Sequence, residues 1–391
     1  GSANSTIKSF YNITLGNSTN LKSPGILIDG SNGTVVENNS IRIVGSTATS
    51  ANQHAIEINR SNQTIIRFNP MITTTGRDSS GITGSSSSRA VLIEHNSWIH
   101  TTGTTAIGIS LGTPNATIRN NSIPNSGGTA DIQLSITRDA IVELNNFNTS
   151  FSMPAIKFDR VTHSIIRNNT INVTGSQGHG ITVSGAGGTS SLNNTIYANR
   201  IRVNGGNAIN FSGGGTSAPF NNTIYDNVFN VSGNVWVSIE TVSKINNISL
   251  GVITAGTNIV GGANLGGNFY ANWTGNGYSE TCTDADADGI CDTALTFDSN
   301  NTDFFPLAVA VLSTSISSCQ TLSTANTVYT LSASVFFTDT CFNITASGVT
   351  LNCDGKTVEY GNFSSGYGVN ITGVNSTTVK NCVFLQQNSS V

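Results

Sequence analysis

Ile118-Arg119-Asn120-Asn121 is the phrase that decides the fold, because variants of it return along the first 250 residues. Each variant has an aliphatic residue, a charged or aromatic residue, a variable residue and then Asn. Successive copies lie 24 to 30 residues apart. A period that varies from copy to copy is typical of stacked coils whose surface loops absorb the differences. The closing residues are Asn39, Asn69, Asn96, Asn121, Asn145, Asn169, Asn199 and Asn227.

A second phrase precedes the copies and carries two apolar residues spaced two apart. Ile156 and Phe158 are one such pair, and Ile181 and Val183 are the next. Spacing of two places both side chains on one face of a strand. Helix periodicity is missing, the regular Leu pattern of leucine-rich repeats is absent, and a propeller needs about 40 residues per blade. We therefore predict an all-β fold, a right-handed parallel β-helix with three short strands per coil.

Stacking the coils predicts two columns of side chains. The closing Asn residues form a ladder at a turn, in which each amide bonds its neighbours above and below. The second column alternates in charge from coil to coil, and opposite charges attract across neighbouring strands where like charges would repel. Its members are Lys8, Glu37, Arg67, Glu94, Arg119, Glu143, Arg167, Tyr197 and Tyr225. We predict an outward-facing ion ladder followed by stacked tyrosines, which requires Arg67 and Glu94 to share a face.

The composition excludes two classes of function. Of 391 residues only 10% are charged, and the formal net charge is −4, against about 25% charged residues in a typical domain. Nucleic-acid binding needs clustered Lys and Arg, and no apolar run is long enough to span a membrane. The charge is uneven, because no base lies between Lys244 and Lys356. Nine of the 21 acids fall in that gap, so 12 acids face 17 bases in the rest of the chain.

The acidic gap contains a calcium-binding pattern. Residues 284–292 read D-x-D-x-D-G-x-x-D, the front of a loop of the EF-hand type with Gly289 at its sharp turn. Position 12 is Leu295 in place of a bidentate Glu, so another acid such as Asp298 or Asp303 would have to replace it. Four acids without a base repel one another unless they share a cation; the alternative is a solvated acidic loop. The predicted Ca²⁺ ligands are Asp284, Asp286, Asp288, the carbonyl of Ile290, and Asp292.

The six cysteines lie in the last third of the chain, and their even number favours disulfides. Cys353 and Cys382 close equivalent phrases of consecutive coils, where neighbouring positions are about 5 Å apart and within disulfide reach. A second pair brackets the acidic loop, and the third follows by elimination. Free buried thiols or a metal site are the alternatives. The predicted pairs are Cys282–Cys291, Cys319–Cys341 and Cys353–Cys382.

About two dozen N-x-S/T sequons occur in the sequence. An Asn-rich and Thr-rich chain generates some by chance, and a ladder Asn that points inward cannot carry a sugar. Their density, together with disulfides and calcium, favours an exported glycoprotein of the cell surface or extracellular space, with N-linked glycans as partners. The candidate glycosylation sites are Asn12, Asn38, Asn120, Asn168, Asn193, Asn221, Asn272, Asn343 and Asn370.

Three segments are expected along the chain. Residues 1–266 form the first β-helix, residues 267–308 an insert with the calcium loop, and residues 309–391 the start of a second β-helix. The repeat phrases resemble those of pectin-lyase-like, carbohydrate-binding parallel β-helices. Gly267-Asn268-Phe269-Tyr270, the acidic loop and Asp303-Phe304-Phe305-Pro306-Leu307 together look like the closing segment of the NosD-like family, associated with periplasmic copper maturation, and of archaeal surface proteins. This resemblance implies an extracellular or surface setting.

A polysaccharide lyase or hydrolase would need grouped carboxylates. Four acids lie in neighbouring coils, but the ion ladder or turn positions explain most of them: Asp131, Asp139, Glu143 and Asp159. Copper would need clustered His or Met, and the five histidines are scattered at 54, 95, 100, 163 and 179. Glycan binding would use exposed aromatics, for which the candidates are Trp98, Trp236, Trp273 and Tyr278, although Trp98 aligns with core positions of other coils.

The favoured reading is a non-enzymatic, structural repeat glycoprotein of a surface layer, sheath, adhesin or extracellular filament. Because Lys8 already belongs to a coil, the helix starts without a cap. An uncapped end predicts self-association, head to tail or lateral, since a head-to-tail contact generates fibres. The alternative is a glycan-binding or polysaccharide-cleaving β-helix, with a surface polysaccharide as partner.

Overall fold

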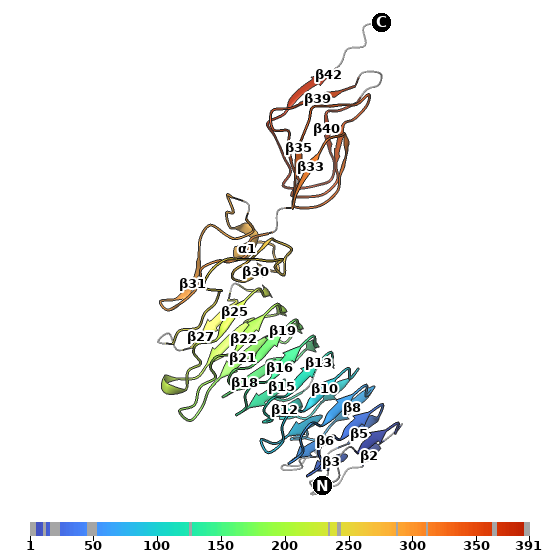
Figure 1. Ribbon diagram of the computed structural model, residues 1–391, viewed down its shortest axis with the longest axis vertical. Helices are drawn as coiled ribbons and strands as arrows, with labels where there is room; N and C mark the ends of the chain where they lie inside the picture. The colour runs from blue at the N-terminus through green and yellow to red at the C-terminus, as the bar shows by residue number, and fades with distance from the viewer. Residues whose placement is uncertain are drawn as a thin grey trace. The chain divides into compact units, whose positions relative to one another are not determined.

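The computed structural model describes residues 5–10, 13–15, 24–44, 53–124, 127–233, 235–240, 244–286, 288–309, 312–361 and 366–386. The chain forms two compact units, the first made of most of residues 1–308 and the second of residues 309–391 with two short loop segments. In each unit, short strands stack in parallel on their equivalents in the next coil (Figure 1). The predicted all-β parallel β-helix is confirmed.

The first sheet of the first unit has nine parallel strands, each of three residues. The middle residue of each strand after the first is buried, and the residues on either side of it face outward in all but one strand. The strands are β1 (Thr6–Lys8), β4 (Val35–Glu37), β7 (Ile65–Arg67), β10 (Leu92–Glu94), β13 (Thr117–Arg119), β16 (Ile141–Glu143), β19 (Ile165–Arg167), β22 (Thr195–Tyr197) and β25 (Thr223–Tyr225).

The second sheet also has nine parallel strands. It carries the apolar pairs spaced two apart, which point into the core with little or no exposure in most coils. The strands are β3 (Ile26–Asp29), β6 (Ile56–Asn59), β9 (Ile82–Gly84), β12 (Ile107–Leu111), β15 (Ala130–Ser135), β18 (Ile156–Asp159), β21 (Ile181–Ser184), β24 (Ile209–Ser212) and β27 (Val237–Ile239).

The third face of the coils is built by a four-stranded and a six-stranded sheet. The four strands are β2 (Ile13–Leu15), β5 (Ser40–Ile43), β8 (Met71–Thr74) and β11 (Ile99–Thr101). The six are β14 (Ser122–Pro124), β17 (Asn146–Thr149), β20 (Thr170–Val173), β23 (Arg200–Val203), β26 (Val228–Val231) and β30 (Phe269–Asn272). Because β30 pairs with β26 in register, residues 269–272 continue the β-helix.

The predicted Asn ladder runs through the buried turn between the first and third faces. Each Nδ2 donates to the Oδ1 of the Asn in the next coil, at 2.9 to 3.3 Å, from Asn39 through Asn227 and on to Asn268. A second, shorter ladder joins Asn194, Asn222 and Asn246 at another turn. These amides satisfy buried backbone groups as well as one another, which fixes the register of the coils.

The ion ladder is present on the outer side of the first sheet. Glu94 pairs in register with Arg67 and with Arg119, so the required common face is confirmed. The closest charged contact within the column joins Arg119 and Glu94 at 2.7 Å, and Arg167 approaches Glu143 equally closely. Arg167 also donates to the Tyr197 hydroxyl at 2.8 Å. The Tyr197 and Tyr225 rings stack at 5.2 Å between centroids, as predicted.

Residues 244–308 close the upper end of the first unit. They contain the bridging strands β28 (Thr254–Ala255) and β29 (Asn264–Leu265), the helix α1 (Tyr278–Thr281) and the antiparallel hairpin of β31 (Leu295–Asp298) and β32 (Asn301–Asp303). A single 3-10 turn, η1 (Gly215–Ser217), lies in an earlier loop. Tyr270 is fully buried and packs on Trp236, with ring centroids 5.6 Å apart, so the closing segment shares the core of the coils.

The second unit repeats the architecture over fewer coils, with its own core. Its first sheet is β33 (Leu312–Ile316), β35 (Thr327–Leu331), β38 (Thr350–Asn352) and β41 (Thr378–Lys380). The other two are β34 (Gln320–Leu322), β37 (Phe342–Ile344) and β40 (Val369–Ile371), and β36 (Val335–Phe336), β39 (Thr357–Tyr360) and β42 (Val383–Gln386).

The expectation that Trp98 packs in the core was wrong. Ile99 pairs with Ile72 and is fully buried, whereas the Trp98 side chain is 45% exposed. The coils that contain Asn69 and Asn96 have one extra residue between the ladder Asn and the first core position. A shift of one residue moves a side chain to the opposite face of a strand.

Candidate functional site

The acidic loop is held in place at both of its ends. The disulfide between Cys282 and Cys291 closes it, with Cα atoms 5.7 Å apart. The Cys291 N–H donates to the Pro306 carbonyl at 2.8 Å, and Ile290 forms an antiparallel bridge with Leu307. Ile290 and Cys291 are buried, so the C-terminal part of the loop is anchored in the closing segment.

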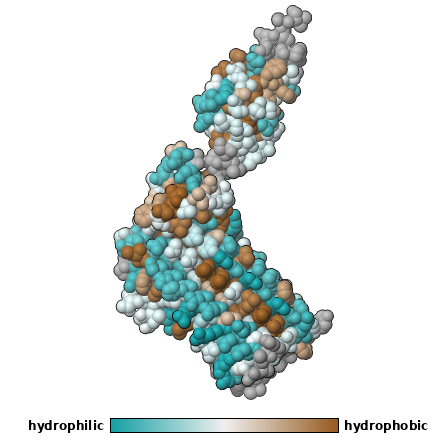
Figure 2. Space-filling view, viewed as in Figure 1, coloured by the Kyte–Doolittle hydropathy of each residue, from teal (hydrophilic) through white to brown (hydrophobic). Residues whose placement is uncertain are grey.

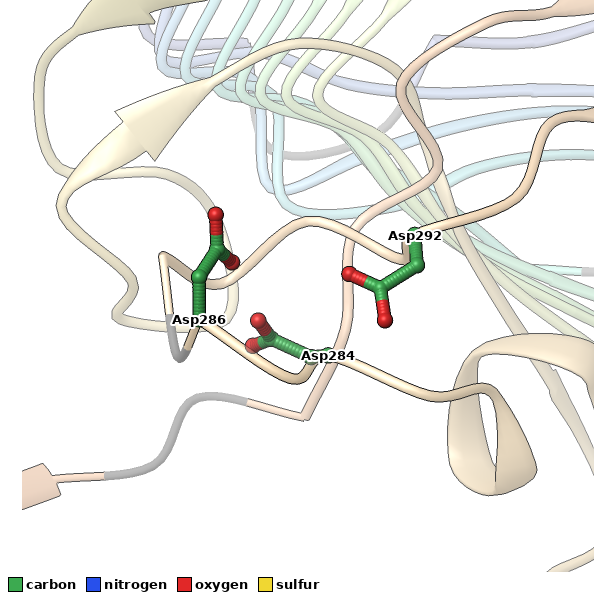
Figure 3. A group of neighbouring side chains, drawn as sticks. All are labelled: Asp284, Asp286 and Asp292. Atoms are coloured by element: carbon green, nitrogen blue, oxygen red, sulfur yellow. The ribbon is translucent and has the colours of Figure 1, made fainter.

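Three of the predicted calcium ligands converge in this loop. Asp284, Asp286 and Asp292 each offer a carboxylate oxygen, and these oxygens lie within 4.8 Å of one another (Figure 3). The Asp292 N–H donates to the Thr283 carbonyl at 2.8 Å, and its carboxylate accepts from the Ala285 N–H at 3.1 Å. These bonds hold the loop folded so that the three carboxylates face a common space.

The remaining predicted ligands are placed differently. Asp288 does not join the group of three carboxylates, and Ile290 is engaged with the closing segment. Asp298 and Asp303, the acids expected to replace the missing Glu, also lie outside the group. Hard carboxylate oxygens in a flexible loop are the donors that Ca²⁺ prefers over softer metals. The arrangement therefore fits a hard cation, with three side-chain ligands on a single loop.

Asp303 instead ends the first Asn ladder. Its Oδ2 accepts from the Asn268 N–H at 2.8 Å and from the Tyr270 hydroxyl at 2.7 Å, while its Oδ1 accepts from the Phe305 N–H at 3.0 Å. The carboxyl is fully buried, and this burial raises its pKa to about 7 against the opposing effect of its hydrogen-bond donors. The same burial raises the pKa of Tyr270 well above its usual value.

Asp298 ends the second ladder in the same way. Asn246 donates its N–H to Asn301 Oδ1 at 2.7 Å, and Asn301 donates its Nδ2 to both Asp298 oxygens at 2.9 and 3.0 Å. Neither ladder end was predicted from the repeat phrases. The short spacing of Asp298, Asn301 and Asp303 after the last repeat phrase was the available signal.

The carboxylates considered for catalysis are occupied by structural contacts. Asp131 is fully buried and accepts from the Thr149 hydroxyl. Asp159 pairs with the adjacent Arg160 at 2.6 Å, and Glu143 belongs to the ion ladder. Asp139 lies 3.7 Å from Arg138 at an exposed turn. The four acids therefore do not form a shared catalytic group in the structure.

The family model described as "Periplasmic copper-binding protein (NosD)" matches residues 73–275, which is slightly more than half of the chain. The chain belongs to the NosD family. The matched region covers most of the first β-helix and reaches β30. The predicted resemblance to NosD-like parallel β-helices is thereby confirmed. No curated protein shows a significant sequence match.

Several solved structures are similar to this chain at low identity. DFA-IIIase from Arthrobacter chlorophenolicus A6, without its lid, is 10% identical, with 85% of this chain and 70% of that chain covered and a TM-score of 0.35. The Dettilon tailspike protein is 11% identical, with 94% and 60% covered and a TM-score of 0.33. A mutant tailspike protein of E. coli bacteriophage HK620 in complex with pentasaccharide is 11% identical, with 97% and 67% covered and a TM-score of 0.34.

The described residues of this NosD-family chain do not fit copper. Copper prefers clustered imidazole, thiolate or thioether ligands, yet the six cysteines are all in disulfides. His54 Nδ1 accepts from the Ser80 N–H at 2.9 Å, and His179 Nδ1 accepts from the Asn207 N–H at 3.1 Å. Burial lowers the pKa of both imidazoles. Over the described part of the chain, the three aspartates form the one group of three or more His, Cys, Asp or Glu side chains placed to share an ion.

The disulfides join the three predicted pairs: Cys282–Cys291, Cys319–Cys341 and Cys353–Cys382. Disulfides persist in oxidising compartments, which agrees with a family described as periplasmic. Among the described residues, no helix has the length and apolar character needed to cross a membrane.

The candidate glycosylation sites differ in accessibility. Asn38, Asn168 and Asn221 are exposed, whereas Asn272 is 7% exposed and its Nδ2 donates to Asn276. Asn12 lies outside the described residues. The remaining candidates are partly exposed: Asn120, Asn193, Asn343 and Asn370.

Proposed function

We propose that this chain is an exported structural glycoprotein, a subunit of a cell-surface layer, sheath, adhesin or extracellular filament. The observation that carries the proposal is that polar side chains of the coils bond to their equivalents in the next coil. Arg167 forms an ion pair with Glu143 on the outside, and Asn145 donates to Asn169 on the inside. The last Asn of the ladder, Asn268, donates its N–H to Asp303. Such an arrangement favours a rigid, protease-resistant rod over a reactive centre.

Calcium is proposed as the ion of the acidic loop. Residues 282–292 include no Lys, Arg or His. Carboxylate oxygens of Asp284, Asp286 and Asp292 lie within 4.8 Å of one another, and a divalent cation would offset the repulsion between these like charges. The loop joins α1 to the hairpin that holds both ladder ends. Bound calcium would therefore stabilise the closing segment of the first unit.

Assembly of the purified chain tests the structural role. We expect electron microscopy of the protein in calcium to show ordered layers or filaments, and sedimentation to show self-association that chelation reverses. Monodisperse monomers in calcium that cleave a polysaccharide would overturn the proposal.

Glycan binding is the second candidate, and two exposed tryptophans favour it. Trp98 lies beside His100, with ring centroids 6.0 Å apart. The Arg202 guanidinium lies 4.1 Å above the Trp273 ring, which is 40% exposed. Aromatic faces next to polar groups are suited to sugar rings. Retention on immobilised surface polysaccharide that is lost in Trp98→Ala or Trp273→Ala would favour this function, and equal retention of both variants would exclude these sites.

A further inference from the structure

The residue before each ladder Asn has a left-handed backbone, with φ between 53° and 58° in the eight coils that hold the repeat phrase. We call these residues the turn column: Asn38, Phe68, His95, Asn120, Leu144, Asn168, Ala198 and Asp226. Asn and Asp tolerate this conformation, but bulky residues rarely adopt it. Phe68 and Leu144 nevertheless stand there, with 48% and 49% of their surfaces exposed.

Two depressions line up along the turn column and meet at Leu144. One, of about 480 Å³, runs from Phe68 past Asn120 to Leu144. The other, of about 400 Å³, runs from Leu144 past Asn168 to Asp226. On the face drawn in Figure 2, the surface of the first unit is mostly hydrophilic, with hydrophobic residues in isolated groups. Leu144 is thus an apolar residue that lines both hollows.

The ladder itself creates glycosylation sequons in this column. A sequon N-x-S/T arises where the left-handed residue is Asn. The buried ladder Asn is then its middle residue, and the Ser or Thr that starts the next strand is its last. This holds for Asn120 with Ser122 and for Asn168 with Thr170. Strands β13, β16 and β19 pair in register, so Asn120 and Asn168 lie one coil below and one coil above Leu144. Neighbouring coils are about 4.8 Å apart.

We propose that N-linked glycans on Asn120 and Asn168 fold back into the turn column and cover Leu144. This inference rests on the glycoprotein reading in the proposed function. The Asn Nδ2 attacks the anomeric carbon of a lipid-phosphate-linked oligosaccharide, a C–N bond forms, the C–O bond to phosphate breaks, and the lipid phosphate leaves while the amide loses a proton. Sugar rings present both C–H faces and hydroxyls, which suits hollows lined by Leu144, Phe68 and side-chain amides.

The test separates the glycan from the side chain beneath it. The exported full chain is made in a secretory host that glycosylates N-x-S/T, and glycopeptide mass spectrometry measures site occupancy. Ser122→Ala with Thr170→Ala removes both sequons and leaves Asn120, Asn168 and Leu144 unchanged. The melting temperature of Leu144→Ser is then measured with and without those two substitutions. We expect both sites to be occupied, and Leu144→Ser to lower the melting temperature by about 2 to 4 °C more when the sequons are intact.

Ile136→Ser is the matched control. Ile136 also has a left-handed backbone, with φ of 50°, and is 62% exposed, but it lies at a different turn. We expect Ile136→Ser to change the melting temperature by the same amount whether the two sequons are intact or removed. Occupied sites with an equal effect of Leu144→Ser in both backgrounds would overturn the inference and leave the glycoprotein reading intact. Glycans found at other sequons but not at Asn120 and Asn168 would also overturn the inference and leave the glycoprotein reading intact. The absence of glycans from every sequon would overturn both the inference and the glycoprotein reading.

Discussion

Replacing Asn145 by Asp puts an oxygen where the ladder requires an N–H donor. Asn145 is 1% exposed, and its Nδ2 donates to the Ile118 carbonyl at 2.9 Å and to Asn169 Oδ1 at 3.1 Å. A carboxylate removes the Nδ2 donor from both acceptors and turns an oxygen toward them, although Asn169 Oδ1 still accepts from the Asn145 N–H at 2.9 Å. Each lost hydrogen bond costs about 0.5 to 1.5 kcal/mol and the buried charge adds to this cost, so we expect Asn145→Asp to destabilise the first unit by at least about 2 kcal/mol.

Thermal unfolding of the chain made without glycans measures this effect. At about 2 to 4 °C per kcal/mol, the melting temperature of the first unit should fall by at least about 4 °C at pH 7. Asn148→Asp is the matched control on the same coil, because Asn148 is exposed and its Oδ1 accepts from Asn172 at 2.9 Å, which Asp also does. If Asn145→Asp melts within about 1 °C of Asn148→Asp, the ladder does not stabilise the fold as argued.

Three further outcomes are expected. The pKa of Asp303 is raised from 3.8 to about 7, so the folded state binds this proton more tightly than the unfolded state and proton binding stabilises the fold. This contribution to the free energy of unfolding is complete below about pH 4 and is lost as the pH rises through 7. The melting temperature measured from pH 4 to 8 should therefore fall with rising pH, and Asp303→Asn should flatten that dependence. Calcium at 100 times its dissociation constant should stabilise the first unit by about 2.7 kcal/mol in calorimetry, and Asp286→Asn, but not the exposed Asp139→Asn, should abolish the shift. Replacing Cys353 and Cys382 together by Ser should cost the second unit about 2 to 4 kcal/mol in denaturant unfolding and leave the first unit unchanged.

The sequence predicted the features that depend on the repeat and failed where the repeat is broken. The common face of Arg67 and Glu94 was predicted because successive side chains of a strand point to opposite faces. Backbone geometry imposes this alternation regardless of distant contacts. Trp98 was misplaced because one extra residue after a turn reverses the facing of the next residues in the strand, and no local pattern marks that insertion. Asp303 was offered, with Asp298, as a replacement for the missing Glu of the calcium loop because both lie near the acidic pattern, whereas its partner Asn268 lies 35 residues earlier in the chain.

The exposure of the turn column could not be read from the repeat either. The phrase shows a variable residue before each ladder Asn, and variability alone suggests a neutral surface position. The structure shows that this residue is held in a left-handed conformation, so Phe68 and Leu144 are held outward in spite of their apolar character. The conformation of the backbone, and not the composition, thus places these two apolar side chains on the surface.

The direction of the ladders explains why each ends on an acid. Every Asn in the first ladder donates both its N–H and its Nδ2 toward the next coil and accepts at Oδ1 from the previous one, so the donors left over gather at Asn268. Another Asn at that end would accept those donors but bring donors of its own, and the chain of bonds would not close. A carboxyl group brings at most one donor, and none once it is ionised. Asp303 accepts from the N–H and Nδ2 of Asn268, and Asp298 accepts from the Nδ2 of Asn301. The closing segment is therefore the polar terminus that the ladders require, and its acidic loop lies next to that terminus along the chain.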